Sequence, residues 1–310
     1  MRSTAINIQK VLLYLKYDNV YLNLNPQFSP RNLHYPISLV NHINGPLYFF
    51  FDEDGIPIRV YKNERFYYLS HLASWGLGNW ELYLNHNNEA YGEKFLRIAD
   101  FILKFGEYKN NELLFKSQKP GKYNGTLSAM DQGLGISVLT RAYRLTGDKK
   151  YIDGAKAALV PFTKFISEGG VRNIIKLNNC IWYEEDTVSR TRHILNGMIY
   201  AMFGLYDLSI LENDLATKLW NTGIESLKSS VALFDCGFWS FYWLDDKGSN
   251  YIASMLYHSL HVHMLKVLYQ ISGEAIFYET YKKFSGYSQN MIYRLRAGVT
   301  IALHKLTMDF

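Results

Sequence analysis

At residues 196–208 the chain reads Asn196-Gly197-Met198-Ile199-Tyr200-Ala201-Met202-Phe203-Gly204-Leu205-Tyr206-Asp207-Leu208. This stretch is apolar and aromatic nearly all round, with two glycines among the large side chains. A helix of this composition has no solvated face, so it is stable only where other elements cover it. The stretch therefore predicts an inner helix of a larger helical assembly.

Similar helices recur along the chain, and each ends on a tyrosine. Aligning Tyr83, Tyr143, Tyr206 and Tyr269 gives spacings of 60, 63 and 63 residues. The predicted inner helices span Ser70 to Leu84, Ser128 to Leu145, Asn196 to Leu208 and Tyr257 to Ile271. Eight positions after the tyrosine the chain has, in order, Tyr91, Tyr151, Asp214 and Phe277, so the third copy departs from the pattern.

A second, amphipathic helix is expected after each inner helix. Glu93 to Lys104 and Glu212 to Lys228, for example, carry Lys and Glu on one face, as outer helices do. Helical hairpins of this length bury little alone and must stack on their neighbours. Four pairs and a terminal segment, Ser288 to Lys305, predict a mainly α fold, an incomplete (α/α) barrel of repeated helical hairpins with an open, concave end.

Residues 1–62 form a different compositional zone, which we expect to pack on a barrel domain of residues 63–310. Five of the seven prolines lie in this zone. The apolar run 46–51, the turn Asp52-Glu53-Asp54-Gly55 and a second run, 56–61, predict a β-hairpin. From Glu64 onward the pattern becomes helical.

Charge and hydropathy argue against a nucleic-acid-binding protein and against a membrane-spanning one. The formal net charge is +5 and the basic residues are scattered, whereas a nucleic-acid partner would need a denser basic surface. No run reaches the ~20 apolar residues of a membrane span. Residues 1–10 contain no apolar core of a signal peptide, so a cytoplasmic protein is expected. Cys180 and Cys236 are expected as buried, reduced thiols.

The unusual feature of the composition is its 25 tyrosines. A tyrosine-rich helical core would produce this count, and so would a surface that stacks on sugar rings and hydrogen-bonds their hydroxyls. Both interpretations stay open at this point.

An acidic pair precedes the 196–208 helix, in the segment Trp182-Tyr183-Glu184-Glu185-Asp186. The segment lies in one of three long connections between hairpins, residues 106–125, 167–192 and 233–250, and such connections are usually functional or disordered. The pair is either a solvated acidic patch at a helix N-terminus or a site. In the second case the neighbouring Trp182 and Tyr183 partly desolvate one carboxylate, whose pKa rises toward that of a useful base.

Three further motifs carry candidate residues. The aromatic segment 234–243 contains Asp235, Gly237 and Tyr242, and it either plugs the barrel or contributes to a site. Tyr257-His258-Ser259-Leu260-His261 places two histidines on one helix face. No third ligand is spaced for zinc, so no metal is expected. Ser128-Ala129-Met130-Asp131-Gln132-Gly133 opens the second inner helix, where Gln132 either bonds sugar hydroxyls or caps a neighbouring loop.

Together these motifs, over roughly residues 65–290, resemble the C-terminal domain of the D-glucuronyl C5-epimerases. The resemblance implies an α/α barrel enzyme that inverts D-glucuronate to L-iduronate within an acidic polysaccharide, without a cofactor. It implies Glu185, Tyr242 and Tyr257 as catalytic residues. The substrate-binding residues we expect are Trp182, Tyr183, Glu184, Gln132, Asn196, His258 and His261. A homodimer is one assembly that the sequence allows.

The chain departs from the family at three places. Asp186 stands where the family usually has a tyrosine, and Leu244 stands where animal members have an arginine. The N-terminal zone is also shorter than in animal members. The clamp on the substrate carboxylate is therefore expected from Arg190, Arg192 and Lys247. Because of these departures, a uronate lyase on the same barrel and a non-catalytic glycan-binding protein remain alternatives to the epimerase.

Overall fold

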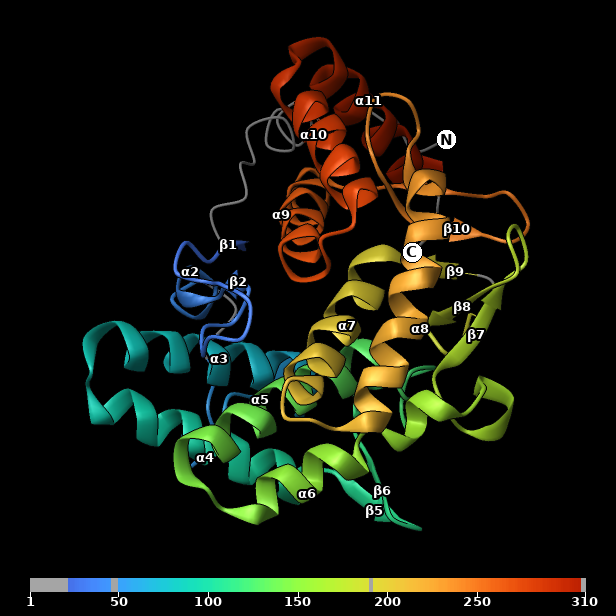
Figure 1. The fold of residues 1–310 in the computed structure, drawn as a ribbon. Helices are drawn as coiled ribbons and strands as arrows, with labels where there is room; N and C mark the ends of the chain where they lie inside the picture. Colours follow the sequence, from blue (N-terminus) through green and yellow to red (C-terminus); the bar gives the residue numbers. More distant parts are fainter. Residues whose placement is uncertain (1–21, 46–49, 190–191, 308–310) are drawn as a thin grey trace.

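Four helical hairpins make up most of the structure (Figure 1). The computed structural model describes residues 22–45, 50–189 and 192–307. The first helices of the hairpins are α3 (Leu69–His86), α5 (Ala129–Thr146), α7 (Leu195–Ser209) and α9 (Met255–Ser272). Their partners are α4 (Glu89–Phe105), α6 (Lys149–Ala157), α8 (Asp214–Ser230) and α10 (Ala275–Gln289), and α11 (Met291–Thr307) follows. All four predicted inner helices are confirmed, to within two residues at each end.

The first helices form the inner layer. Helix α5 packs between α3 and α7, and α7 packs against α9, while each partner helix lies against the first helix of its own hairpin. Helix α7 is buried along nearly its whole length, whereas α4 and α8 expose a polar face. This layering confirms the predicted mainly α, incomplete (α/α) barrel.

Glycines let α5 and α7 approach each other closely. A Cβ atom on Gly133 would lie 2.5 Å from the Cα of Ala201, and one on Gly204 would overlap the carbonyl group of Gly133. Any larger side chain at either position would push the helices apart. The glycines of the two sequence motifs therefore have a packing role at the centre of the barrel.

The tyrosine repeat reflects how the inner helices end. Helices α3, α5 and α9 are followed by Asn87, Gly147 and Gly273, each in the left-handed conformation, with the N–H bonded to the carbonyl group of the repeat tyrosine. Helix α7 instead has its C-cap, Ile210, in the right-handed region, and the turn that follows is two residues longer before the N-cap Asn213 of α8. Asp214 is consequently the first residue of α8, which explains why the third copy departs from the pattern.

The long connections carry short antiparallel strands. They are β5 (Glu107–Lys109) with β6 (Glu112–Leu114), β7 (Arg172–Ile175) with β8 (Cys180–Tyr183), and the sheet β11-β10-β9 of β9 (Arg192–Ile194), β10 (Phe241–Asp245) and β11 (Tyr251–Ile252). In the last sheet Ile194 pairs with Trp243. This pairing joins the connection before α7 to the connection before α9, and it brings two of the predicted motifs together.

The N-terminal segment bridges the first and last inner helices. It contains β1 (Asn23–Leu24), β2 (Ile37–Ser38) and α2 (Val40–Ile43); β1 contacts α9 and α2 contacts α3. Arg141 of α5 donates to the carbonyl oxygens of Leu33 and His34, and it makes a buried two-point ion pair with Asp207 of α7. These bonds fix the segment near the C-terminal ends of the inner helices.

The predicted N-terminal hairpin falls partly on residues 46–49, which lie outside the described residues. Within the described part, Phe51 bridges Pro57 across the turn, and Gly55 takes a φ of 73°. The chain then forms β3 (Arg59–Tyr61) and β4 (Glu64–Phe66), a second hairpin. The prediction that helical structure begins at Glu64 is therefore wrong, because cross-strand pairing continues to Phe66 and α3 begins at Leu69.

The structure tests two further expectations from the sequence. Over the described ranges, no helix combines the length and the apolar character that a membrane crossing requires. Cys180 and Cys236 are both free thiols. Each is partly exposed rather than buried, because Cys180 opens β8 at the surface and Cys236 lies in the tight turn at Gly237.

Candidate active site

A pocket of about 260 Å³ opens at the N-terminal ends of the inner helices. Its lining includes Tyr68 before α3, Asp131 in the first turn of α5, Glu185 before α7, and Tyr242 and Trp243 of β10. Helix N-termini carry partial positive charge and unpaired N–H groups, so anionic ligands are favoured at this end of the barrel.

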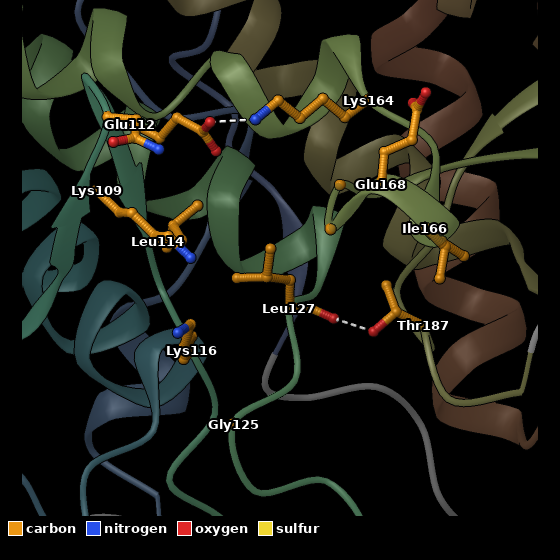
Figure 2. A pocket seen from close by; sticks show the side chains of 13 residues that line it. Lys109, Glu112, Leu114, Lys116, Gly125, Leu127, Lys164, Ile166, Glu168 and Thr187 are labelled. Atoms are coloured by element: carbon orange, nitrogen blue, oxygen red, sulfur yellow. Dashed lines mark hydrogen bonds and ion pairs between the residues drawn. The ribbon is translucent and has the colours of Figure 1, made fainter.

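Glu185 is placed by contacts on both sides of it. The preceding carbonyl group, that of Glu184, accepts a hydrogen bond of 2.8 Å from the N–H of Ala129. The hydroxyl of Thr187 donates to the carbonyl oxygen of Leu127 at 2.7 Å (Figure 2). The Glu185 side chain lies over the first turn of α7, where Asn196 Nδ2 approaches its carboxylate at 3.5 Å.

Gly197 makes room for this carboxylate. A Cβ atom at Gly197 would lie 2.5 Å from the Cβ of Glu185 and closer still to its carboxylate oxygen. The Asn196-Gly197 pair of the sequence motif therefore has a positional role in the site.

Gly197→Ala is expected to displace the Glu185 side chain and to lower activity on the order of 10²-fold, because misplacement of a reacting group by about 1 Å has that effect. Alanine is a better helix former than glycine, so the melting temperature should not fall in proportion. Turnover and thermal melting of the same preparation check this. Full activity would show that Glu185 does not need its observed position.

Two carboxyl groups with raised pKa values share the pocket. Burial, and then the negative charges of Asp131, Asp186 and Glu184, raise the pKa of Glu185 to about 8. Burial raises the pKa of Asp131 to about 7, although a backbone hydrogen bond at Ser70 opposes the rise. Asp131 is 1% exposed, and its Oδ1 atom has no hydrogen-bond partner among the described residues. The charges of the two groups are coupled, so the ionisation of one disfavours the ionisation of the other.

Sequence reasoning missed Asp131 as a functional residue. Ser128 is the N-cap of α5, and its hydroxyl accepts from the N–H of Asp131. An Asp in the first turn after a Ser reads as an ordinary helix-start residue. Only the fold shows that this carboxyl group is buried and faces Glu185.

Asp131→Asn is expected to move the acidic limb of the pH–activity profile to lower pH. The negative charge of Asp131 raises the pKa of Glu185, so a neutral amide lets Glu185 ionise at lower pH. If Glu185 acts as the base, activity at pH 6 should rise relative to activity at pH 8. A profile with an unmoved acidic limb would contradict the coupling of the two carboxyl groups.

Two tyrosines complete the pocket wall. The rings of Tyr242 and Tyr257 lie 4.6 Å apart, and their hydroxyl groups are hydrogen-bonded to each other. Burial, followed by the nearby Glu185 charge, raises the pKa of both phenols. The phenols therefore stay protonated at neutral pH, as a proton donor must. Tyr242 lines the pocket, and Tyr257, at the start of α9, lies against it.

Several predicted substrate-binding residues lie beneath the pocket instead of in it. Trp182 and Tyr183 are fully buried: Trp182 stacks on Phe234, and the Tyr183 hydroxyl donates to the carbonyl oxygen of Leu219. These two side chains belong to the core, and they separate the acidic segment from solvent on its inner side.

Gln132 has an internal role as well. Its side chain is fully buried; it accepts from the N–H of Phe115 and donates to the carbonyl oxygens of Leu113 and Ala158. Of the two interpretations of Gln132, the geometry fits the brace of a neighbouring segment and does not fit a contact with sugar.

The two histidines of the α9 motif are also enclosed. His258 and His261 are fully buried and both contact the hydroxyl of Ser240, at 2.8 and 2.9 Å. Burial lowers the pKa of both imidazoles, so they are neutral hydrogen-bonding groups. Through Ser240, which directly precedes β10, they connect this strand to α9. Neither histidine lines the pocket.

Glu184 points away from Glu185 into a buried network that the sequence did not indicate. Its carboxylate lies 2.6 Å from His193 Nδ1 and accepts from Asn173 at 2.9 Å, while His193 Nε2 lies 3.1 Å from Asp246. Burial alone would lower the pKa of His193, but the two carboxylates outweigh it and raise that pKa. The network joins β7, β8, β9 and the turn after β10 under the site.

His193→Gln is expected to destabilise the fold by about 3–5 kcal/mol, because it leaves two buried carboxylates without their shared cation. The midpoint of urea unfolding should fall with an unchanged m-value. A loss below about 1 kcal/mol would show that the network carries little net energy.

The predicted cationic residues have different positions. Arg192 lines the pocket, with its guanidinium 4.9 Å from the ring centroid of Trp243. Arg190 lies outside the described residues. Lys247 is exposed in the turn after β10, and its backbone N–H donates to Asp245. Lys119, from the connection before α5, also lines the pocket; no pattern in the sequence singled it out.

Asp186, the residue that replaces a family tyrosine, has a local partner of its own. One carboxylate oxygen accepts from the N–H groups of Val188 and Ser189 at 3.0 Å and so shapes the turn after Glu185. Asp186 also lines the pocket, where its charge helps to raise the pKa of Glu185.

Comparison with known proteins identifies the relatives of this chain. Residues 104–286 match the family model described as the D-glucuronyl C5-epimerase C-terminus. The chain belongs to the D-glucuronyl C5-epimerase family. The matched range contains Asp131, Glu185, Tyr242 and Tyr257, so the carboxyl groups and the tyrosine pair of the site all lie in the epimerase-family segment, whereas Tyr68 lies outside it.

Two relatives give the extent of the similarity. The D-glucuronyl C5-epimerase of Caenorhabditis elegans is 38% identical over 226 residues, which are 66% of this chain and 36% of that protein. An uncharacterized protein of Methanocaldococcus jannaschii is 29% identical over 163 residues, 52% of this chain and 52% of that protein. This chain of the epimerase family thus spans only about a third to a half of these relatives.

Solved structures with some likeness include the unsaturated glucuronyl hydrolase of Bacillus sp. GL1. It is 15% identical, with a TM-score of 0.48, and the match covers 76% of this chain and 61% of that chain. A polysaccharide lyase is 14% identical, with a TM-score of 0.41, over 96% of this chain and 36% of that chain. Both scores are below 0.5, and the architecture of this epimerase-family chain rests on its own helix packing.

Proposed function

We propose that this chain is a uronosyl C5-epimerase that inverts D-glucuronate to L-iduronate, or a related uronate pair, within an acidic polysaccharide. The observation that carries the proposal is the pocket itself. A partly accessible glutamate of raised pKa and a hydrogen-bonded tyrosine pair meet there on segments of different hairpins. Family membership supports the uronic-acid chemistry.

The reaction removes the C5 proton and returns a proton to the opposite face. Ionised Glu185 accepts the C5 proton, and the electron pair moves into the substrate carboxylate, which becomes enolate-like. Tyr242 then donates its phenolic proton to C5 from the other side, and the hydroxyl of Tyr257 hydrogen-bonds to the resulting phenolate. A base with a pKa near the working pH and a donor already in place are the usual requirements for such a step.

Positive charge around the pocket supports the enolate-like state. Arg192 and Lys119 both line the pocket, and the N-terminal ends of α5 and α7 face it. Cations and helix N-termini at the point where negative charge develops lower the barrier, because they are already oriented before the reaction. In this proposal Arg192 takes the role of the carboxylate clamp.

The products of an unsulfated glucuronate-containing polysaccharide test this proposal. NMR after incubation should show iduronate signals at unchanged chain length. Shortened chains with an unsaturated uronate at the new end would instead identify a lyase. Bound but unaltered polysaccharide would identify a glycan-binding protein without catalysis.

A further inference from the structure

A second hollow adjoins the pocket. It has a volume of about 400 Å³, and two of its lining residues, Leu127 and Thr187, also line the pocket at Glu185. The two shared residues are hydrogen-bonded to each other, as Figure 2 shows, and we call them the Leu127–Thr187 divide. The pocket at Glu185 is smaller than the ~300 Å³ of a small ligand site, so a ligand longer than one sugar must extend beyond it.

Three lysines from separate segments line this second hollow: Lys109 at the end of β5, Lys116 after β6, and Lys164 before β7. We call it the lysine hollow. Figure 2 shows Lys109 and Lys116 on the β5–β6 side, and Lys164 on the side of Glu168. The β5–β6 hairpin places Lys109 and Lys116, and the fold adds Lys164 from a segment distant in the chain.

The carboxylates of the lysine hollow are already engaged. Glu112 is paired with Lys164, and Glu168 accepts from the N–H of Phe165. Lys116 pairs with Glu107 at 2.7 Å, but both side chains of that pair are at least one-third exposed. Such an exposed pair is worth only about 0–1 kcal/mol, so an incoming anion can replace Glu107 at little cost. Among the described residues Lys109 has no ion pair within 4 Å.

We propose that the lysine hollow is an anion subsite, which binds an acidic group on a sugar next to the one that reacts. The ligand class is an oligosaccharide with repeated anionic groups, carboxylate or sulfate, that crosses the Leu127–Thr187 divide. Lys119 and Arg192 in the first pocket and Lys109 and Lys116 in the second then form a cationic path along one chain. This inference rests on the proposed function, because it assumes that the reacting uronate sits at Glu185.

The test compares the double variant Lys109→Gln/Lys116→Gln with a matched control, Lys218→Gln/Lys282→Gln, whose lysines are exposed on the outer helices α8 and α10. The substrates are uronate oligosaccharides of two sugars and of eight sugars. For the long substrate the test variant should raise KM about two- to thirty-fold, the effect of two exposed ion pairs, with unchanged kcat. The KM for the short substrate and the behaviour of the control variant should not change.

Salt and sulfation make the test specific. The wild-type KM for the long substrate should rise with salt more steeply than that of the variant, since the screened contacts are those at the two lysines. A larger effect with a sulfated than with an unsulfated octasaccharide identifies sulfate as the group bound, and an equal effect identifies carboxylate. An unchanged KM and salt slope with the long substrate would overturn the subsite.

The subsite and the catalytic proposal fail in different ways. Direct titration of the unsulfated octasaccharide measures binding whether or not the protein also converts it. If the protein binds it through Lys109 and Lys116 but does not alter C5, the proposed function is wrong and the anion subsite stands. If C5 is inverted equally well in the short and long substrates, the subsite is wrong and the function stands.

Discussion

Glu185→Gln is expected to lower the rate of C5 inversion by about 10²- to 10⁴-fold, the usual contribution of a general base. The amide keeps the size of the side chain and can still contact Asn196, but it cannot take a proton. The fold should remain intact, because Glu185 is partly exposed and its negative charge is repelled by Asp131, Asp186 and Glu184. A neutral amide removes this repulsion. Initial rates from NMR, with thermal melting of the same sample, measure both effects.

A matched control separates the role of Glu185 from the general loss of a carboxylate. Glu225 lies exposed on α8, where it pairs with Lys228, and Glu225→Gln should leave the rate unchanged. A Glu185→Gln variant with wild-type turnover would exclude Glu185 as the base and leave Asp131 as the next candidate.

Tyr242→Phe is the second large effect that we expect, a loss on the order of 10²-fold or more in kcat, because the pocket loses its proton donor. The ring remains to pack against Tyr257 and Trp243, so binding and melting should change little. The diagnostic result is a fall in kcat at nearly constant KM, since the lost interaction operates only in the reaction step.

Tyr257→Phe separates two roles for the second tyrosine. If Tyr257 only supports Tyr242 from the side, the loss of activity in Tyr257→Phe should be smaller than the loss in Tyr242→Phe, and the pKa of Tyr242 should fall, because Tyr257 helps to raise it. A larger loss for Tyr257→Phe would reverse the assignment and make Tyr257 the donor. Equal, wild-type rates for both variants would remove the tyrosine pair from the mechanism.

The helices of this fold are predictable from sequence because their signal is local. A largely apolar stretch such as 196–208 is stable as a helix only inside an assembly, and three of the four repeat tyrosines mark helix ends with a left-handed cap. The strands between the helical hairpins were harder to predict from the sequence. Residues 192–194 and 241–245 pair only because the fold brings two distant connections together, and no local pattern records that partner.

The candidate site was predictable in part for the same reason. Glu185, Tyr242 and Asn196 stood in recognisable motifs, and the structure gathers them at one pocket or its edge. Trp182, Gln132 and His261 stood in the same motifs, but they support the site from inside the core. A motif residue that holds the backbone and one that faces the substrate look alike in sequence, because both depend on the same local geometry. Asp131 was missed because the carboxyl group that it influences, that of Glu185, is distant in the chain.

The most direct test of the account is the fate of the C5 proton in heavy water. Wild-type protein and Glu185→Gln are incubated with the unsulfated polysaccharide in deuterium oxide, and the deuterium at C5 is measured by NMR together with chain length. The account predicts that every inverted uronate of the wild-type reaction carries deuterium at C5, that the chains keep their length, and that Glu185→Gln incorporates almost none. Inverted units that keep their original C5 proton, or equal incorporation by the two proteins, would contradict it.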